Sequence, residues 1–147
     1  MKWRILSILL FVFAYVMGGC GKSATPSPSS EPLAIEDRAS LLKALQAAGA
    51  TVEVGDSITQ DFFSPEGHTV KVNGVDLQVF EYETMEAMEN EASQVSPDGG
   101  SIGTSMVTWI DSPHFYKDGR ILVLYVGSDK TTLDLLEKVI SPQFAGQ

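Results

Sequence analysis

The chain has 147 residues, 44% of them hydrophobic, and its 19 acidic residues outnumber its 10 basic ones to give a formal net charge of −9. This charge repels phosphate groups and anionic lipid headgroups, which argues against nucleic-acid binding and against electrostatic attachment to a membrane. The single cysteine excludes an intramolecular disulfide.

The first 19 residues have the pattern of an export signal. Lys2 and Arg4 precede an apolar run from Ile5 to Met17, which matches the basic and hydrophobic regions of a signal peptide. A helix of this length spans only about 20 Å, short of the roughly 30 Å hydrocarbon core of a bilayer. Cleavage is therefore favoured over the alternative, an uncleaved transmembrane anchor.

Two small residues, Gly18 and Gly19, stand directly before the lone Cys20. This arrangement resembles the lipobox of bacterial lipoproteins. The resemblance implies cleavage between Gly19 and Cys20, a lipid on the Cys20 thiol, and attachment to a cell membrane or outer membrane with the rest of the chain extracytoplasmic. A spare or dimerising thiol is the alternative. The overlapping sequence "GCGKS" lacks the first glycine of a phosphate-binding loop, where Val16 stands, so we expect no nucleotide site.

A Ser- and Pro-rich segment follows the cysteine. Residues 20–32 contain too little apolar surface to fold, so we expect a tether there. Residues 33–147 are enough for one domain with a single core. Removing residues 1–19 takes away Lys2 and Arg4 and no acid, which leaves a net charge of −11.

The domain is expected to begin with a helix in "EDRASLLKALQAAGA". It starts at Glu36 or Asp37 and ends at Gly49. Its apolar face comprises Leu41, Leu42, Leu45 and Ala48. A short strand at residues 51–54 follows, and then a loop in which Phe62 and Phe63 are interpreted as core residues rather than a binding feature.

Two strand–turn–strand–helix units make up most of the remaining sequence. Asn73-Gly74 and Asp118-Gly119 each separate two β-rich runs, and both dipeptides are typical of a type I′ hairpin turn. Helical patterns follow at residues 84–95, with Met85 and Met88 as core residues, and at residues 129–140.

The segments between and after these turns complete the predicted sheet. The unbroken apolar run Ile121–Val126 indicates a central strand, and "SMVTWI" at residues 105–110 indicates one more strand. The predicted fold is α+β, a mostly antiparallel sheet of five or six strands with three helices.

Candidate catalytic and metal-binding residues are few. His68 and His114 each start a hairpin strand without a second ligand at metal-site spacing. Asp111, Ser112 and His114 are too close along one strand to form a triad. Five glutamates cluster at the end of one strand and the start of a helix, where a divalent cation site is the less favoured alternative to ordinary solvated positions: Glu81, Glu83, Glu86, Glu89 and Glu91. We expect no catalytic set, metal or cofactor.

Residues 96–116 are the candidate interaction surface, because they join a Gly/Ser-rich segment to aromatic residues. The residues singled out are Ser101, Thr104, Trp109, His114, Phe115 and Tyr116. The alternative is that the aromatic side chains fill the core.

The expected function is that of a membrane-tethered lipoprotein that binds an envelope protein or a small ligand. A structural or stress-related envelope accessory is the alternative, and an enzyme is less favoured. The C-terminal domain is similar to small uncharacterised bacterial lipoproteins, a resemblance that implies no activity.

Overall fold

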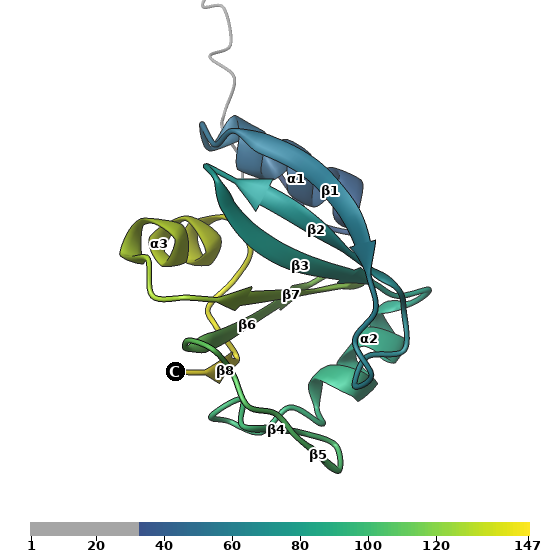
Figure 1. Ribbon diagram of the computed structural model, residues 1–147. Helices are drawn as coiled ribbons and strands as arrows, with labels where there is room; N and C mark the ends of the chain where they lie inside the picture. The colour runs from purple at the N-terminus through teal and green to yellow at the C-terminus, as the bar shows by residue number, and fades with distance from the viewer. Residues whose placement is uncertain (1–32) are drawn as a thin grey trace, which may run out of the picture.

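The computed structural model describes residues 33–147, and the predicted export signal, Gly19, Cys20 and tether lie outside the described residues. The described chain has an α+β fold, as expected (Figure 1). Its helices are α1 (Arg38–Ala47), α2 (Met85–Ala92) and α3 (Lys130–Val139). None of them combines the length and the apolar character needed to cross a bilayer.

Six strands form an antiparallel sheet in the order β1-β2-β3-β7-β6-β8. They are β1 (Val52–Ile58), β2 (Gly67–Val72), β3 (Val75–Glu81), β6 (Pro113–Asp118), β7 (Ile121–Val126) and β8 (Ala145–Gly146). A separate two-stranded sheet contains β4 (Ser101–Ile102) and β5 (Ser105–Met106). As predicted, β7 is central and almost entirely buried.

Side-chain caps start all three helices. The carboxylate of Asp37 accepts a hydrogen bond from the Ser40 backbone N–H, and the Ser40 hydroxyl accepts one from the Asp37 backbone N–H. Thr84 and Asp129 cap α2 and α3 with their side chains, which accept hydrogen bonds from the backbone N–H groups of Ala87 and Thr132. Each cap satisfies a backbone donor that the first helical turn leaves free, so the helix starts follow directly from the sequence.

Two predicted core positions are wrong. Ala48 is exposed, and Ala44 is buried between Leu41 and Leu45 in its place. Met88 is buried as expected, but Met85 is 59% exposed. Both wrongly predicted residues lie at a helix end. Met85 is the first residue of α2, where the chain has not yet reached the surface of the sheet, and Ala48 is the C-cap of α1, where the chain leaves it.

The two hairpin turns differ. Val72 pairs with Val75, and both Asn73 and Gly74 have positive φ (51° and 87°), which confirms a type I′ turn. In the second hairpin Asp118 pairs with Ile121, so the loop consists of Gly119 and Arg120. Only Gly119 of these two has positive φ (52°), as in a type II′ turn. The prediction of a type I′ turn at Asp118-Gly119 is therefore wrong in turn type and in position, because the loop begins one residue later.

The strand predicted at residues 105–110 is also wrong. Only Ser105–Met106 is extended, and it pairs with β4 instead of joining the main sheet. The indole Nε1 of Trp109 donates to the backbone oxygen of Gly99 (2.7 Å), and its ring meets Phe115 edge-on. These contacts hold the segment after β5 over a face of the sheet.

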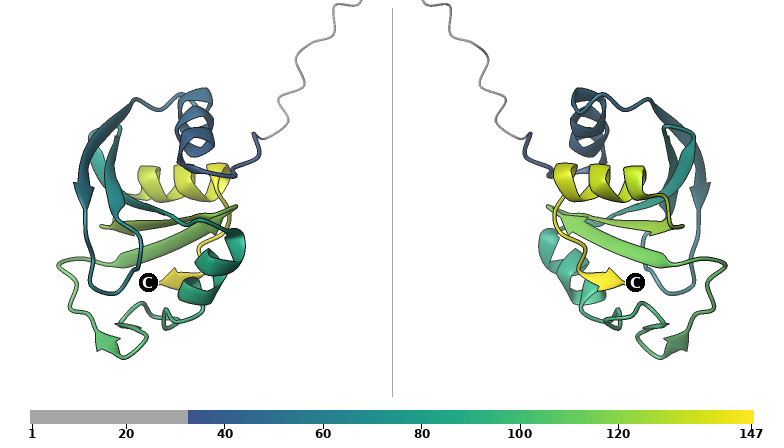
Figure 2. Two further views of the ribbon diagram at one scale, coloured as in Figure 1. Left: turned by 90° about the vertical axis from the view of Figure 1, so that its right-hand side faces the viewer. Right: turned by 90° about the vertical axis from the view of Figure 1, so that its left-hand side faces the viewer.

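Hydrophobic clusters lie on both faces of the sheet. α1 and α3 cover one face, where Leu45, Val123 and Leu136 belong to one cluster. α2 and the segment that contains β4 and β5 lie on the other face (Figures 1 and 2), where Phe80 and Met88 pack with Phe63, which confirms Phe63 as a core residue. The two hairpin–helix units thus send their helices to opposite faces.

Candidate functional site

The sheet face that carries α2 is only partly covered. Strand pairing places four residues in one row across this face: Thr69, Gln78, Leu124 and Phe115. Phe115 and Leu124 are buried, whereas Thr69 and Gln78 are half-buried. In the adjacent row, Lys71 pairs with Asp76, and their side chains are 43% and 59% exposed. The cover over the sheet therefore ends within these two rows.

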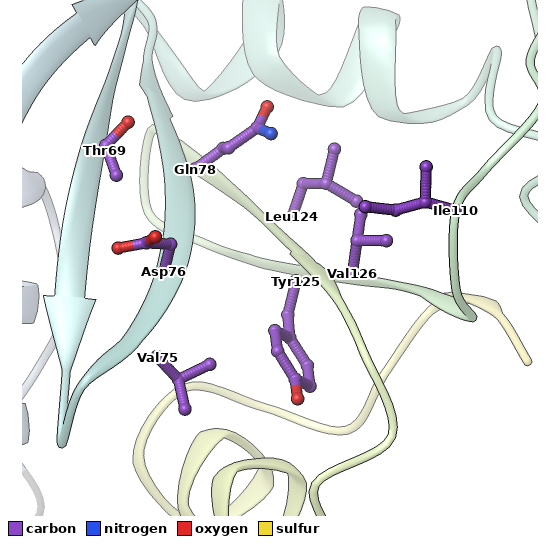
Figure 3. A pocket seen from close by; sticks show the side chains of 8 residues that line it. All are labelled: Thr69, Val75, Asp76, Gln78, Ile110, Leu124, Tyr125 and Val126. Carbon is purple, nitrogen blue, oxygen red and sulfur yellow. The ribbon is translucent and has the colours of Figure 1, made fainter.

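A cavity of about 450 Å³ lies where the cover ends (Figure 3). We call it the open groove and define it by six side chains: Thr69, Asp76, Gln78, Ile110, Leu124 and Val126. Val75 and Tyr125 also line it, but their side chains extend toward α3 and belong to the cluster on the opposite face. The volume lies in the range typical of ligand pockets.

The polar groups of the open groove are of three kinds. Asp76 accepts a hydrogen bond from the Lys71 ammonium (2.7 Å), and its side chain is 59% exposed. The Gln78 Oε1 accepts one from the Gln60 amide (2.8 Å). The Gln78 amide nitrogen and the Thr69 hydroxyl form no hydrogen bond with another residue in 33–147. The groove can thus offer a carboxylate, an amide donor and a hydroxyl to a ligand.

Ile110 forms the apolar end of the open groove. It is 99% exposed, and its side chain points toward Leu124 and Val126 (Figure 3). Met106, in the same connection between β4 and β6, is 91% exposed. Of these two residues only Ile110 lines the groove, where it adds aliphatic surface to Leu124 and Val126.

The segment that presents Ile110 is held by internal hydrogen bonds. The carboxylate of Asp98 accepts hydrogen bonds from the Ser96 hydroxyl (2.7 Å) and the Gly100 backbone N–H (3.0 Å), and these bonds lower the pKa of Asp98. The neighbouring Trp109 is anchored to Gly99 and packs against Phe62 as well as Phe115. Ile110 is therefore presented by an ordered segment, which lowers the entropy cost of binding.

The predicted interaction surface is only partly at the surface. Thr104 is exposed, and Ser101 and Trp109 are half-buried. His114, Phe115 and Tyr116 are buried, so their assignment to a surface is wrong. All three belong to β6, which pairs with β7 and β8, and its side chains enter both clusters. For these aromatic residues, the structure supports the core alternative.

Sequence reasoning missed the residues that form the open groove. The strand predicted at residues 105–110 includes Ile110, which instead lies on the segment that crosses the sheet face. A usable signal was present in β3, where Asp76 and Gln78 alternate with buried Leu77 and Val79. Polar residues on one face of an interior strand indicate that this face lacks cover.

The two histidines differ in their surroundings, because His114 is buried and His68 is half-buried. The His114 ring stacks on Tyr125, with Nδ1 2.6 Å from the Gln143 amide oxygen and Nε2 2.9 Å from the Gly127 backbone oxygen. Asp111 accepts a hydrogen bond from the backbone N–H of Ser112, its neighbour. His68 lines a shallower hollow of about 280 Å³ among charged side chains. Within residues 33–147 no three metal-ligating side chains converge.

The clustered glutamates make separate contacts. Glu81 pairs with Arg120 (2.5 Å), and Glu89 pairs with Lys117. Glu91 accepts a hydrogen bond from the Tyr82 hydroxyl (2.7 Å). Burial and this carboxylate raise the pKa of Tyr82, so the phenol stays a donor. Glu89 and Glu91 thus connect α2 to the sheet and, through the Ser64 backbone N–H that donates to Glu91, to the loop before β2, whereas Glu81 of β3 pairs with the turn between β6 and β7.

Comparison with protein-family models, with curated proteins and with solved structures finds no significant match. A function for the chain is therefore inferred from its own residues.

Proposed function

We propose that the protein is an exported lipoprotein held at a bacterial membrane by a lipid on Cys20, and that residues 33–147 form a binding module. The basic start, the short apolar run and the glycines before the lone cysteine support the lipid anchor. The net charge of the chain supports a covalent attachment over an electrostatic one.

The open groove is the observation that carries the binding function. It combines hydrogen-bonding groups with aliphatic surface, and ligand sites need both for orientation and affinity. The described chain begins beside α1, while β4 and β5 lie on the opposite side of the domain (Figures 1 and 2). An anchor before residue 33 leaves this opposite side accessible to a partner.

Metabolic labelling with an alkyne fatty acid tests the anchor. We expect the wild-type chain to carry the label and Cys20→Ser to lose it, because lipidation requires the thiol. Label retained on the serine variant contradicts the lipid anchor.

Capture from detergent-solubilised membranes tests the binding module. We expect the full-length wild-type chain to retain a defined partner and Ile110→Ser to lose it with an unchanged melting temperature. Met85→Ser removes another exposed apolar side chain, outside the groove, and serves as the matched control. Equal capture by both variants contradicts a role for the open groove.

A further inference from the structure

We infer that the open groove binds an extended segment of a protein partner in which a lysine or arginine and a large aliphatic residue lie two positions apart. This inference rests on the proposed binding function and adds the chemistry of the partner.

Charge favours a cationic partner. Residues 33–147 contain 18 acidic and 7 basic residues. Lys71, the basic residue beside the groove, is already paired with Asp76. This pair carries no net charge, so the attraction comes from the rest of the described residues, whose net charge of −11 attracts a cationic segment and speeds its association. A second copy of this chain carries the same excess of acid and is repelled.

The distance between side chains of the groove determines how far apart the matching side chains of an extended partner segment must lie. Leu77 pairs with Tyr125 on the face covered by α1 and α3, so Asp76 and Val126 are neighbours on adjacent strands of the groove face. Adjacent strands lie about 4.8 Å apart, and alternate residues of an extended chain lie about 6.5–7 Å apart on the same side. Because the second distance is the longer one, a cationic side chain over Asp76 places an aliphatic side chain two positions away beyond Val126, on the side of Ile110 (Figure 3).

The remaining groove groups suit the backbone of such a segment. A peptide in extended conformation needs partners for its N–H and C=O groups, and the Gln78 amide and the Thr69 hydroxyl can supply them. The Lys71–Asp76 pair is exposed, and exposed pairs contribute little to stability. A partner cation can therefore share the Asp76 carboxylate without a large penalty.

Fluorescence polarisation with designed peptides tests the inference on the full-length chain in nonionic detergent, with empty micelles as the blank. The probe peptide repeats Lys-Ser-Val-Ser, which places lysine and valine on one side of an extended chain. One control repeats Lys-Val-Ser-Ser, which has the same composition but puts these residues on opposite sides. A second control replaces lysine with glutamate.

We expect the probe to bind at least about tenfold more tightly than either control, and Asp76→Asn and Ile110→Ser each to weaken binding by about tenfold. Glu137→Gln removes an acid from α3 on the opposite face and should have no effect, as should Met85→Ser. Raising salt from about 0.05 M to about 0.5 M should weaken binding of the probe.

The contradicting outcomes separate this inference from the proposed function. Equal binding of the glutamate or the spacing control overturns the partner chemistry. If no peptide binds while Ile110→Ser still abolishes partner capture, the inference fails and the binding module stands. If partner capture is also insensitive to Ile110→Ser, both fail. Dimerisation that depends on Ile110, measured by sedimentation, assigns the groove to a second copy and overturns the inference.

Discussion

Two buried tyrosines illustrate how differently one residue type is used. The Tyr82 hydroxyl donates to Glu91. The Tyr116 hydroxyl is buried without a partner within residues 33–147. An unsatisfied buried hydroxyl loses its hydration without compensation. The two positions therefore predict opposite effects for the same substitution.

We expect Tyr82→Phe to destabilise the fold by about 1–2 kcal/mol, because it removes a hydrogen bond to a carboxylate. Tyr116→Phe should leave stability unchanged or raise it by up to about 1 kcal/mol, because it removes a hydroxyl with no partner. Urea unfolding of both variants measures the two changes. A loss at Tyr116 as large as that at Tyr82 would mean that its hydroxyl has a partner.

Tyr116 also predicts a loss of stability at alkaline pH. Burial, with the Glu137 charge adding to it, raises the pKa of Tyr116 to about 12 from the ordinary value of 10.0. Between these values the unfolded chain releases the proton and the folded chain keeps it, so stability is full below pH 10 and falls as pH rises toward 12. In Tyr116→Phe this decline should be shallower. Identical pH profiles of the free energy of unfolding would exclude this assignment.

The two hairpin turns offer a matched pair at the scale of secondary structure. Gly74 and Gly119 both have positive φ, but a Cβ on Gly74 meets nothing within 4 Å. A Cβ on Gly119 lies 2.5 Å from the Ile35 backbone oxygen and 2.6 Å from the Glu36 Cα. The second turn therefore packs directly against the chain that leads into α1.

We expect Gly74→Ala to cost about 1 kcal/mol, the penalty for positive φ alone. Gly119→Ala should cost more than about 2 kcal/mol, because the backbone of residues 35 and 36 must also move. Thermal unfolding of the two variants gives the comparison. Equal losses would show that the turn does not pack against the start of α1.

Local signals explain which elements could be predicted from the sequence. Caps at Asp37, Thr84 and Asp129 and the Asn73-Gly74 turn act over a few residues, so the helix starts and the first hairpin agree with the structure. The segment at residues 105–110 has the composition of a strand, but its path is set by contacts of Trp109 with Gly99 and Phe115. Such tertiary contacts override strand propensity and have no local signature.

On the scale of the whole molecule, one sheet separates two hydrophobic clusters. Leu77 and Val79 of β3 face one cluster, and Phe80 of the same strand faces the other. Because both clusters share the central strands, we expect the truncated chain that starts at Leu33 to unfold in one cooperative transition. Circular dichroism and tryptophan fluorescence should give coincident melting curves. Separate transitions, or aggregation on expression, would contradict an independently folding domain.

The position of the open groove could not be predicted from the sequence, because the groove also depends on tertiary contacts. Its residues come from β2, β3, β7 and the segment before β6, and only strand pairing brings Thr69, Gln78 and Leu124 into one row. The sequence did indicate the neighbourhood, because Ile110 lies within the predicted surface of residues 96–116. It did not show that Phe115 and Tyr116 turn inward while Ile110 stays exposed.

Photo-crosslinking in intact membranes tests the central claim, that the open groove is the binding surface, most directly. A photoreactive phenylalanine analogue replaces Ile110 in one full-length chain and Glu137, on the opposite face, in a second. We predict a discrete adduct with a protein partner from position 110, with a lower yield when Asp76→Asn is added, and none from position 137. An adduct from position 137 alone, or equal adducts from both positions, would contradict the claim.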